Sequence, residues 1–239
     1  MFLTSSPYEG DHFSEANGFV RNLRQALPAA CRVAFVCSSP DDPERTDFFA
    51  ESTLDALKMT GISVSGWTVL DRRNQDDAAA VIRDADFVIL AGGHVPTQNK
   101  FFMEIGLREI LRGFDGVVMG ISAGSMNAAR VVYAQPELSG EATDPDYRRF
   151  LPGLGLTETM ILPHLNMIRE DVLDGQRLFE DIAFPDSMGR RFFAIPDGTY
   201  FLIRDGVETL HGDGWVIADG KMEKFGGKTH PSAARDGKR

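Results

Sequence analysis

The chain has 239 residues, which is enough for one α/β domain with a sizeable buried core. Its 35 acidic side chains outnumber its 25 lysines and arginines, and the formal net charge of −10 argues against a nucleic-acid partner, because phosphate binding needs a basic face. The first residues lack the basic and apolar regions of a signal peptide, and no apolar run reaches the length of a membrane span. We therefore expect a cytoplasmic protein without a membrane partner.

In the first two-thirds of the chain, short β-rich runs alternate with helical patterns, which is typical of parallel βαβ units. The expected strands cover residues 2–4, 32–37, 62–70, 86–91 and 116–119. The expected helices cover residues 14–27, 47–59, 76–83, 98–112 and 123–129. This alternation predicts a three-layer α/β/α sandwich with a mostly parallel sheet.

Beyond Arg130 the pattern changes, and residues 133–155 read as a long loop rich in Pro, Gly and Asp. Strands are expected over 157–162 and 192–195, and a helix over 171–183. Residues 199–225 predict β-hairpins with turns at Asp205-Gly206, Gly212-Asp213-Gly214 and Asp219-Gly220. We expect a single domain over residues 1–225 and a flexible tail over residues 226–239.

The two cysteines, Cys31 and Cys37, lack a CxxC spacing and have no histidine near them in the sequence. They predict buried, reduced thiols rather than zinc ligands. We expect neither a metal nor a cofactor.

The most informative segment is the motif Gly120-Ile121-Ser122-Ala123-Gly124, which follows an apolar strand and precedes a helix. This context is what a nucleophile elbow requires, because small neighbours let strand and helix approach closely while the serine hydroxyl stands above the sheet edge. At the positive end of the helix, the N–H of Ala123 can help to stabilise an oxyanion. The alternative is a structural turn that contains a serine by chance; the strand–helix context favours the catalytic interpretation.

A serine nucleophile needs a base, and His164 directly follows a predicted strand, at the edge where the sites of doubly wound sheets assemble. The alternative is a loop histidine with a satisfied hydrogen bond. Asp197 follows another apolar strand and could orient the imidazole, but Asp-Gly pairs also favour plain turns, so both interpretations stay open. Gly92-Gly93 could likewise supply an oxyanion donor or form a simple β–α turn.

With a Gly-Gly turn, a serine elbow, Pro163-His164 and Pro196-Asp197-Gly198 in this order, the chain resembles the aspartyl dipeptidase (peptidase E) and cyanophycinase family of serine peptidases. The resemblance runs from the first strand to about Arg204 and implies the class I glutamine amidotransferase-like fold. It also implies a triad of Ser122, His164 and Asp197, with oxyanion donors from Gly93 and Ala123. The order serine, histidine, acid separates the chain from α/β-hydrolases, in which the acid precedes the histidine.

The chain departs from the family pattern at three places. The acidic residue is commonly glutamate in the family and is Asp197 here. Residues 94–99 differ from the family's usual continuation after the glycines. After His164 the chain carries Arg169 and Arg177, where relatives carry several arginines.

The resemblance implies a small peptide substrate, with N-terminal aspartyl dipeptides as the leading class. An aspartyl carboxylate needs a fork of donors, which arginine matches, and we predict Arg169 for this role. We predict that Glu137 holds the α-ammonium of the substrate. Both side chains could instead be solvated surface charges.

Two other functions stay open. One is an amidase or a cyanophycinase-like β-aspartyl peptidase on the same scaffold, which the unusual residues 94–99 suggest. The other is a non-catalytic binding protein that has retained the pocket. Exposed edge strands are compatible with a homodimer.

Overall fold

The computed structural model describes residues 1–225 and 230–231. The larger sheet begins with five parallel strands. They are β1 (Phe2–Thr4), β4 (Cys31–Val36), β5 (Val64–Leu70), β6 (Phe87–Leu90) and β7 (Val117–Ile121). Three antiparallel strands extend the sheet beyond β1, and they are β14 (Tyr200–Arg204), β15 (Val207–His211) and β18 (His230–Pro231). In the described residues the order is β18-β15-β14-β1-β7-β6-β4-β5, which confirms the predicted mostly parallel α/β sheet.

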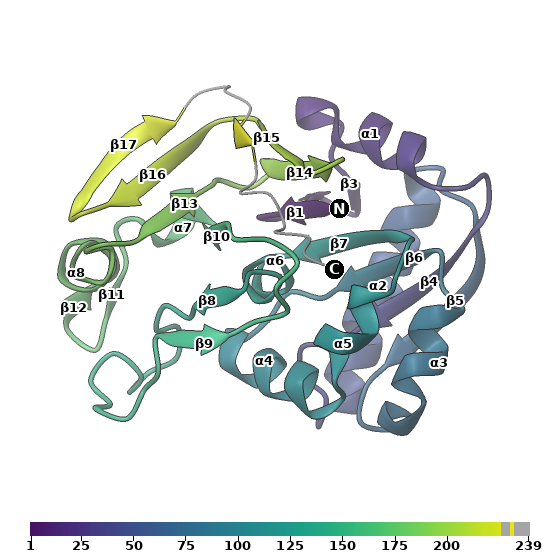
Figure 1. Ribbon diagram of the computed structural model, residues 1–239, viewed down its shortest axis with the longest axis horizontal. Coiled ribbons are helices and arrows are strands. Elements are labelled where there is room, and N and C mark those ends of the chain that lie inside the picture. The colour runs from purple at the N-terminus through teal and green to yellow at the C-terminus, as the bar shows by residue number, and fades with distance from the viewer. Residues whose placement is uncertain (226–229, 232–239) are drawn as a thin grey trace, which may run out of the picture.

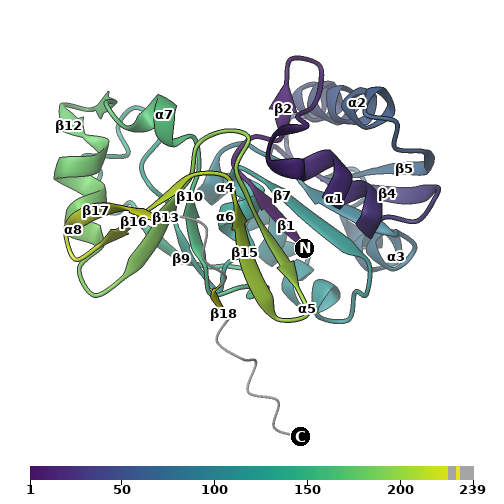
Figure 2. The same cartoon turned by 90° about the horizontal axis from the view of Figure 1, so that it is seen from above.

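Helices cover both faces of the parallel part, as Figures 1 and 2 show. Helices α1 (Phe19–Ala26) and α2 (Pro43–Met59) lie on one side, and α3 (Ala78–Arg83) and α5 (Leu107–Arg112) lie on the other. All four residues of the central strand β6 are buried, because helices exclude water from both of its faces.

A second, smaller sheet lies beside the first, on the left in Figure 1. Its strands are β10 (Met160–Leu162), β13 (Arg191–Ala194), β16 (Gly214–Ala218) and β17 (Lys221–Phe225). Strand β8 (Val131–Tyr133) packs against it, with the ring of Tyr133 stacked on Phe192 at 4.1 Å between centroids. The sequence pattern predicts these strands but not their separation into a second sheet.

The C-terminal hairpins form where the Asp-Gly pairs predict them. Asp205-Gly206 connects β14 to β15, and Asp219-Gly220 connects β16 to β17. All four turn residues have positive φ, which the tight hairpin turns of this kind require. The predicted hairpin at 212–214 is wrong, because this segment carries the chain from the larger sheet to the smaller one.

Two expected helices change because residues with left-handed backbone angles interrupt the helical pattern. The helix expected over 14–27 starts only at Phe19, after Asn17 and Gly18 with positive φ. The helix expected over 98–112 is split at Gly106 into α4 (Val95–Glu104) and α5.

The helix expected over 171–183 is wrong in its first half. Strands β11 (Val172–Leu173) and β12 (Gln176–Arg177) form a small hairpin around Asp174-Gly175, and one wide helical turn (Leu178–Ala183) follows. The long loop expected over 133–155 contains strand β9 (Phe150–Pro152), which pairs with β8.

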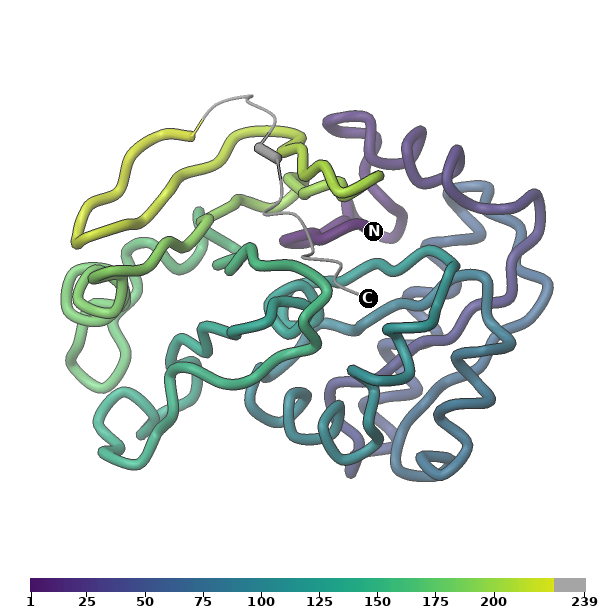
Figure 3. Tube along the Cα trace, viewed as in Figure 1, coloured from purple at the N-terminus to yellow at the C-terminus, as the bar shows by residue number. Residues whose placement is uncertain are grey.

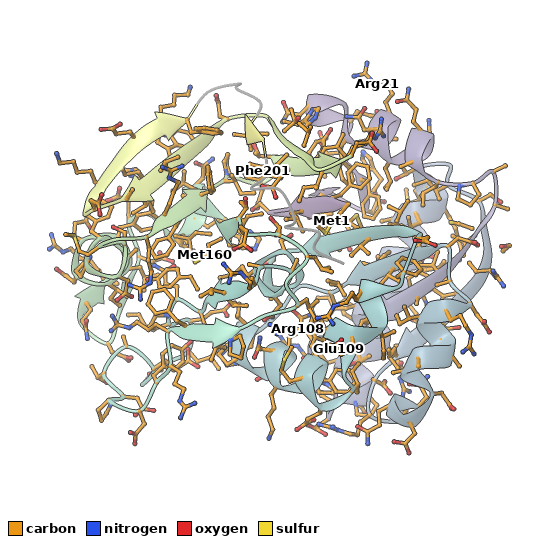
Figure 4. All side chains as sticks on the ribbon, in the orientation of Figure 1. Met1, Arg21, Arg108, Glu109, Met160 and Phe201 are labelled. Atoms are coloured by element: carbon orange, nitrogen blue, oxygen red, sulfur yellow. The ribbon has the colours of Figure 1, made fainter. Side chains whose placement is uncertain are left out.

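Strand β1 lies between segments that are distant in sequence, namely β7 on one side and β14 on the other (Figure 3). The N-terminal ammonium of Met1 donates a hydrogen bond to the carbonyl of Ile203 at 2.8 Å. Met1 and Phe201 both contribute to an apolar cluster at this junction, and Figure 4 labels them. The start of the chain therefore lies in the middle of the sheet.

Both cysteines are buried and unpaired, as expected, and burial together with the charge of Asp71 raises the pKa of Cys37 to about 12. None of the described helices is long and apolar enough to cross a bilayer. Of the expected tail, residues 230–231 pair with β15, whereas 226–229 and 232–239 lie outside the described residues.

Candidate active site

Ser122 stands at a sharp turn between strand β7 and helix α6 (Ala123–Asn127). Its backbone has φ 48° and ψ −110°, a conformation that costs an L-residue on the order of 1–3 kcal/mol. Its N–H donates to the carbonyls of Thr4 and Ser5 at 3.1 and 2.9 Å, so the end of β1 fixes the turn. This arrangement is the geometry of a nucleophile elbow.

Gly124 lets helix α6 approach the neighbouring strand β6. A Cβ atom added at this position would lie 2.1 Å from the carbonyl oxygen of Leu90, which is backbone and has little freedom to move. The second glycine of the motif is therefore required by packing rather than by its own dihedral angles.

His164 lies two residues after the end of strand β10 and precedes the short helix α7 (Leu165–Ile168). It is a further non-glycine residue with positive φ, at 58°. Its Nε2 lies 2.8 Å from Oγ of Ser122, and its Nδ1 lies 2.7 Å from Oδ1 of Asp197. The structure thus brings together the three side chains that the sequence pattern and the family resemblance indicate.

Asp197 follows strand β13 and lies in a turn closed by the bond from the Thr199 N–H to the Pro196 carbonyl. It is therefore both a turn residue and the partner of His164. Burial pushes its pKa upward, but hydrogen bonds from His164 and Ser5 outweigh burial and hold the pKa below the ordinary value. Because an ionised carboxylate only accepts hydrogen bonds, Nδ1 of His164 carries the hydrogen and Nε2 is left to accept one from Ser122.

Ser5 is a fourth member of this network that the sequence analysis does not single out. Its hydroxyl donates to Oδ1 of Asp197 at 2.6 Å and accepts from the backbone N–H of His164 at 2.8 Å. Its side chain is fully buried. In the sequence, only its position could have indicated Ser5: it follows the first predicted strand, at the same edge of the sheet as Ser122.

The Gly92-Gly93 turn lies against the elbow, since a Cβ at Gly92 would lie 3.5 Å from Cβ of Ser122. Gly93 has φ 152°, and a Cβ there would lie 2.3 Å from Oγ of Ser38. The Ala123 N–H belongs to the first helical turn, whose N–H groups have no intrahelical partner. Gly93 lines both of the cavities that Ser122 lines, and Ala123 directly follows Ser122 in the chain.

Glu137 lies beside Ser122 because a second carboxylate anchors its loop. Glu141 accepts from the N–H groups of Glu137 and Leu138 at 2.8 and 2.9 Å. Its other oxygen lies 2.8 Å from Nε2 of His94. Residues 94–99, which depart from the family pattern, therefore begin helix α4 and hold the loop that carries Glu137. Cleft walls around Glu137 partly desolvate its carboxylate and raise its pKa, although the side chain keeps contact with solvent.

The two arginines that follow His164 lie elsewhere. Arg169 contacts Sδ of Met222 and the carboxylate of its neighbour Glu170. Arg177 is paired with Asp181. Among the described residues, neither arginine lines a cavity that contains Ser122.

Two cavities meet at Ser122, and both are lined by Gly93, Ser122, Glu137 and His164. The apolar cavity, of about 180 Å³, continues over mainly aliphatic side chains. They include Val95, Met126, Leu162, Ile168, Leu173 and Leu178. The Arg45 cavity, of about 280 Å³, continues over other side chains, which include Ser6, Tyr8, Arg45, Phe49 and Thr53. Each cavity is smaller than a drug-sized pocket and fits one or two amino-acid side chains.

A larger hollow of about 760 Å³ lies at the opposite edge of the sheet, around Arg32, Asp86 and Val117. These residues lie at the amino ends of β4, β6 and β7, whereas sites in open α/β sheets form beyond the strand carboxyl ends. Its size alone therefore does not make it the active site. The described residues contain no group of three or more His, Cys, Asp or Glu side chains that could hold a metal ion.

A scan against protein families matches peptidase family S51 over residues 1–209. The chain belongs to peptidase family S51. Two solved structures share its fold. A peptidase from an acI-B1 actinobacterium superposes with a TM-score of 0.62 at 16% identity, over 98% of this chain and 94% of the other. A protein assigned to peptidase E, from Listeria monocytogenes EGD-e, superposes with a TM-score of 0.57 at 18% identity, over 94% of this chain and 98% of the other.

A search among curated proteins finds no match to this S51 peptidase. Family membership makes the protein a peptidase and confirms the resemblance to peptidase E drawn from its motifs. The structural similarity confirms the three-layer fold.

The elbow of this S51 peptidase can be tested at Gly124. We expect Gly124→Ala to lower the free energy of unfolding by about 1–3 kcal/mol, because its methyl group collides with the Leu90 carbonyl. Gly113→Ala is the matched control, since nothing lies within 4 Å of a Cβ there, and it should be close to neutral. Urea denaturation of both variants measures the difference. Equal stability of the two would contradict the close approach of α6 to β6.

Ser5 can be tested as a positioning residue. We expect Ser5→Ala to lower kcat by about ten- to a hundredfold with KM unchanged, because Asp197 and His164 each lose a hydrogen bond. Ser5→Thr, which keeps the hydroxyl, should restore part of the loss. Steady-state kinetics on a dipeptide substrate measures both parameters.

The control for Ser5 is Ser187→Ala. Ser187 is equally buried, donates to the carbonyl of Phe184 and accepts from the N–H of Gly220, but lines neither cavity. It should lose stability without losing kcat. A similar fall in kcat in both variants would show that Ser5 matters only for folding.

Proposed function

We propose that this S51 peptidase hydrolyses N-terminal aspartyl dipeptides, with Ser122, His164 and Asp197 as a catalytic triad. The observation that carries the proposal is the continuous hydrogen-bond chain from Asp197 through His164 to Ser122, with links of 2.7 and 2.8 Å. A serine, an imidazole and a carboxylate in this order can generate a nucleophile without a metal. The conformation of Ser122 further supports the proposal, because it presents the hydroxyl to both cavities.

In the first half of the reaction, Nε2 of His164 takes the Ser122 proton as Oγ attacks the peptide carbonyl carbon. Negative charge collects on the carbonyl oxygen, and the N–H groups of Gly93 and Ala123 stabilise it. Asp197 holds the imidazole in its tautomer and stabilises the imidazolium. His164 then gives the proton to the leaving amine, and the C–N bond breaks.

In the second half, the aspartyl group is esterified to Oγ of Ser122. A water molecule gives a proton to Nε2 of His164 and attacks the ester carbonyl. The same two N–H groups stabilise the second oxyanion. The proton returns to Ser122 as the ester bond breaks and free aspartate leaves.

The substrate's α-ammonium is assigned to Glu137. This carboxylate lines both cavities beside Ser122 and is held in place through Glu141 and His94. An anionic side chain at this position selects for a free amino terminus, which restricts the enzyme to the first residue of a short peptide.

The catalytic proposal is tested by Ser122→Ala. Removing the nucleophile should lower kcat for Asp-Leu by about 10⁴-fold or more, and should abolish labelling by a fluorophosphonate probe. Ser52→Ala, a change of an exposed serine on helix α2, should label and turn over like the parent protein. Labelling that survives in Ser122→Ala would contradict the assignment of the nucleophile.

The alternatives give different outcomes in the same assay. Preferred turnover of acyl amides or of β-aspartyl-arginine would favour the amidase or the cyanophycinase-like peptidase over the aspartyl dipeptidase. A parent protein that neither labels nor turns over any of these compounds would favour the non-catalytic binding protein.

The role of Glu137 predicts a pH dependence of KM. Burial raises the pKa of Glu137, so its carboxylate takes up a proton at a higher pH than an ordinary glutamate and stops binding the ammonium. We therefore expect KM for Asp-Leu to rise as the pH falls toward this raised pKa. Glu137→Gln should have a KM about tenfold higher at neutral pH and should lose this rise.

N-acetyl-Asp-Leu provides the control for this prediction, because it has no ammonium for Glu137 to bind. The parent should have a higher KM for it than for Asp-Leu, and Glu137→Gln should not raise that KM further. If Asp-Leu shows the same KM in both proteins across the pH range, Glu137 does not bind the amino terminus.

A further inference from the structure

Arg45 is the cationic side chain of the Arg45 cavity, one of the two cavities that Ser122 and His164 line. It lines this cavity together with Glu137, and no lysine or other arginine lines it in the described part of the chain. Arg45 lies in the first turn of helix α2, where its own N–H donates to the side chain of Asp42 at 3.0 Å. Helix α2 therefore fixes the backbone that carries the guanidinium.

The guanidinium of Arg45 is exposed to solvent and is not neutralised by a carboxylate among the described residues. Its carbon lies 5.7 Å from the ring centroid of Phe49, one turn along the same helix, which is cation–π distance. Among the described residues, no carboxylate lies within ion-pair distance of it. By contrast Arg72, Arg73 and Arg177 each bind at least one carboxylate. In a chain with a net charge of −10, an arginine left unpaired beside the nucleophile is available for an anionic ligand.

Arg45 and Glu137 give the cavity two oppositely charged groups. They are too far apart to form an ion pair, yet the charge of Arg45 acts on Glu137 and lowers its pKa against the effect of burial. A ligand that spans them must carry both an ammonium and a carboxylate. An N-terminal aspartyl residue carries both groups on one amino acid.

The apolar cavity on the other side of Ser122 cannot hold the carboxylate in this way. Its acidic lining residues are Glu137 and Asp171, and in the described residues neither a lysine nor an arginine lines it. A carboxylate there would be desolvated beside two acidic side chains. An aliphatic side chain would instead bury apolar surface against Leu162, Leu173 and their neighbours.

We propose that Arg45 binds a carboxylate group of the substrate, and that the apolar cavity receives the side chain of the other residue of the dipeptide. The proposal rests on the proposed peptidase function, since it assigns the two sides of that same site. The β-carboxylate of an N-terminal aspartate satisfies Arg45 while its ammonium reaches Glu137. The α-carboxylate at the end of the dipeptide offers the same chemistry, and the experiment separates the two sources.

The experiment measures binding in the Ser122→Ala protein, which cannot cleave the ligand, by titration calorimetry. Asp-Leu is compared with Asn-Leu, which lacks the side-chain carboxylate, and with Asp-Leu-amide, which lacks the terminal one. We expect Arg45→Ala to weaken Asp-Leu binding by about ten- to a hundredfold, and Arg45→Lys to weaken it less. If the β-carboxylate is the partner, Asn-Leu is insensitive to Arg45→Ala and Asp-Leu-amide is sensitive. The reverse pattern identifies the terminal carboxylate.

The matched control is Arg83→Ala, which removes an arginine from another helix, where its side chain is 72% exposed and lines neither cavity. It should leave all three affinities unchanged. Replacing Leu by Asp in the second position should weaken binding through the apolar cavity.

The proposal is overturned if Arg45→Ala binds Asp-Leu as tightly as its parent, or if the affinity falls in Arg169→Ala instead. It is also overturned if the Ser122→Ala protein binds no Asp-Leu. Failure of the proposed function looks different. In that case the protein with Ser122 intact does not hydrolyse Asp-Leu, while the Ser122→Ala protein still binds it in an Arg45-dependent way.

Discussion

Ser5 contacts both the acid and the base of the site: its hydroxyl donates to Asp197 and accepts from the N–H of His164. Its carbonyl accepts from Ser122, and its N–H donates to Thr199, two residues after the acid. One residue at the end of strand β1 thus connects segments that are more than a hundred residues away in sequence. Ser122 follows β7 of the larger sheet, whereas His164 and Asp197 follow β10 and β13 of the smaller one, so the proposed triad forms where the two sheets meet at Ser5.

The same strand end also offsets local strain. Ser122 and His164 both have positive φ, which costs each on the order of 1–3 kcal/mol and persists only where surrounding contacts determine the backbone. For Ser122 these contacts are the hydrogen bonds to Thr4 and Ser5, and the buried hydroxyl of Ser125 donates to the Thr4 carbonyl as well. The backbone geometry of Ser122 is in this way fixed by buried hydrogen-bond partners rather than by solvent-exposed side chains.

The parts that could be predicted from the sequence are those in which local pattern and tertiary structure agree. Continuous apolar runs such as Phe87–Leu90 predict buried parallel strands, and the spacing around Ser122 predicts the elbow. The order of motifs also indicates the family. His164 and Asp197 could be named because each lies within three residues of the end of a strand, and the carboxyl ends of parallel strands meet at one edge.

The remaining features depend on contacts between distant segments or on single left-handed residues. Gly106 divides one helical pattern into two, and Asp174-Gly175 converts another into a hairpin. Arg45 is an ordinary charged position in a helix until the fold places it beside Ser122, whereas Arg169, five residues from His164, turns toward Met222. Sequence proximity to a catalytic residue is therefore a poor guide to which side chains enter its cavities.

Proton NMR of the His164 ring is the measurement that tests the central hydrogen-bond chain most directly. We expect a resonance for the Nδ1 hydrogen far downfield of the backbone amides, because Asp197 accepts it at short range. This resonance should disappear in Asp197→Ala and shift in Ser5→Ala. A spectrum without it, or one in which it survives the loss of Asp197, would contradict the triad.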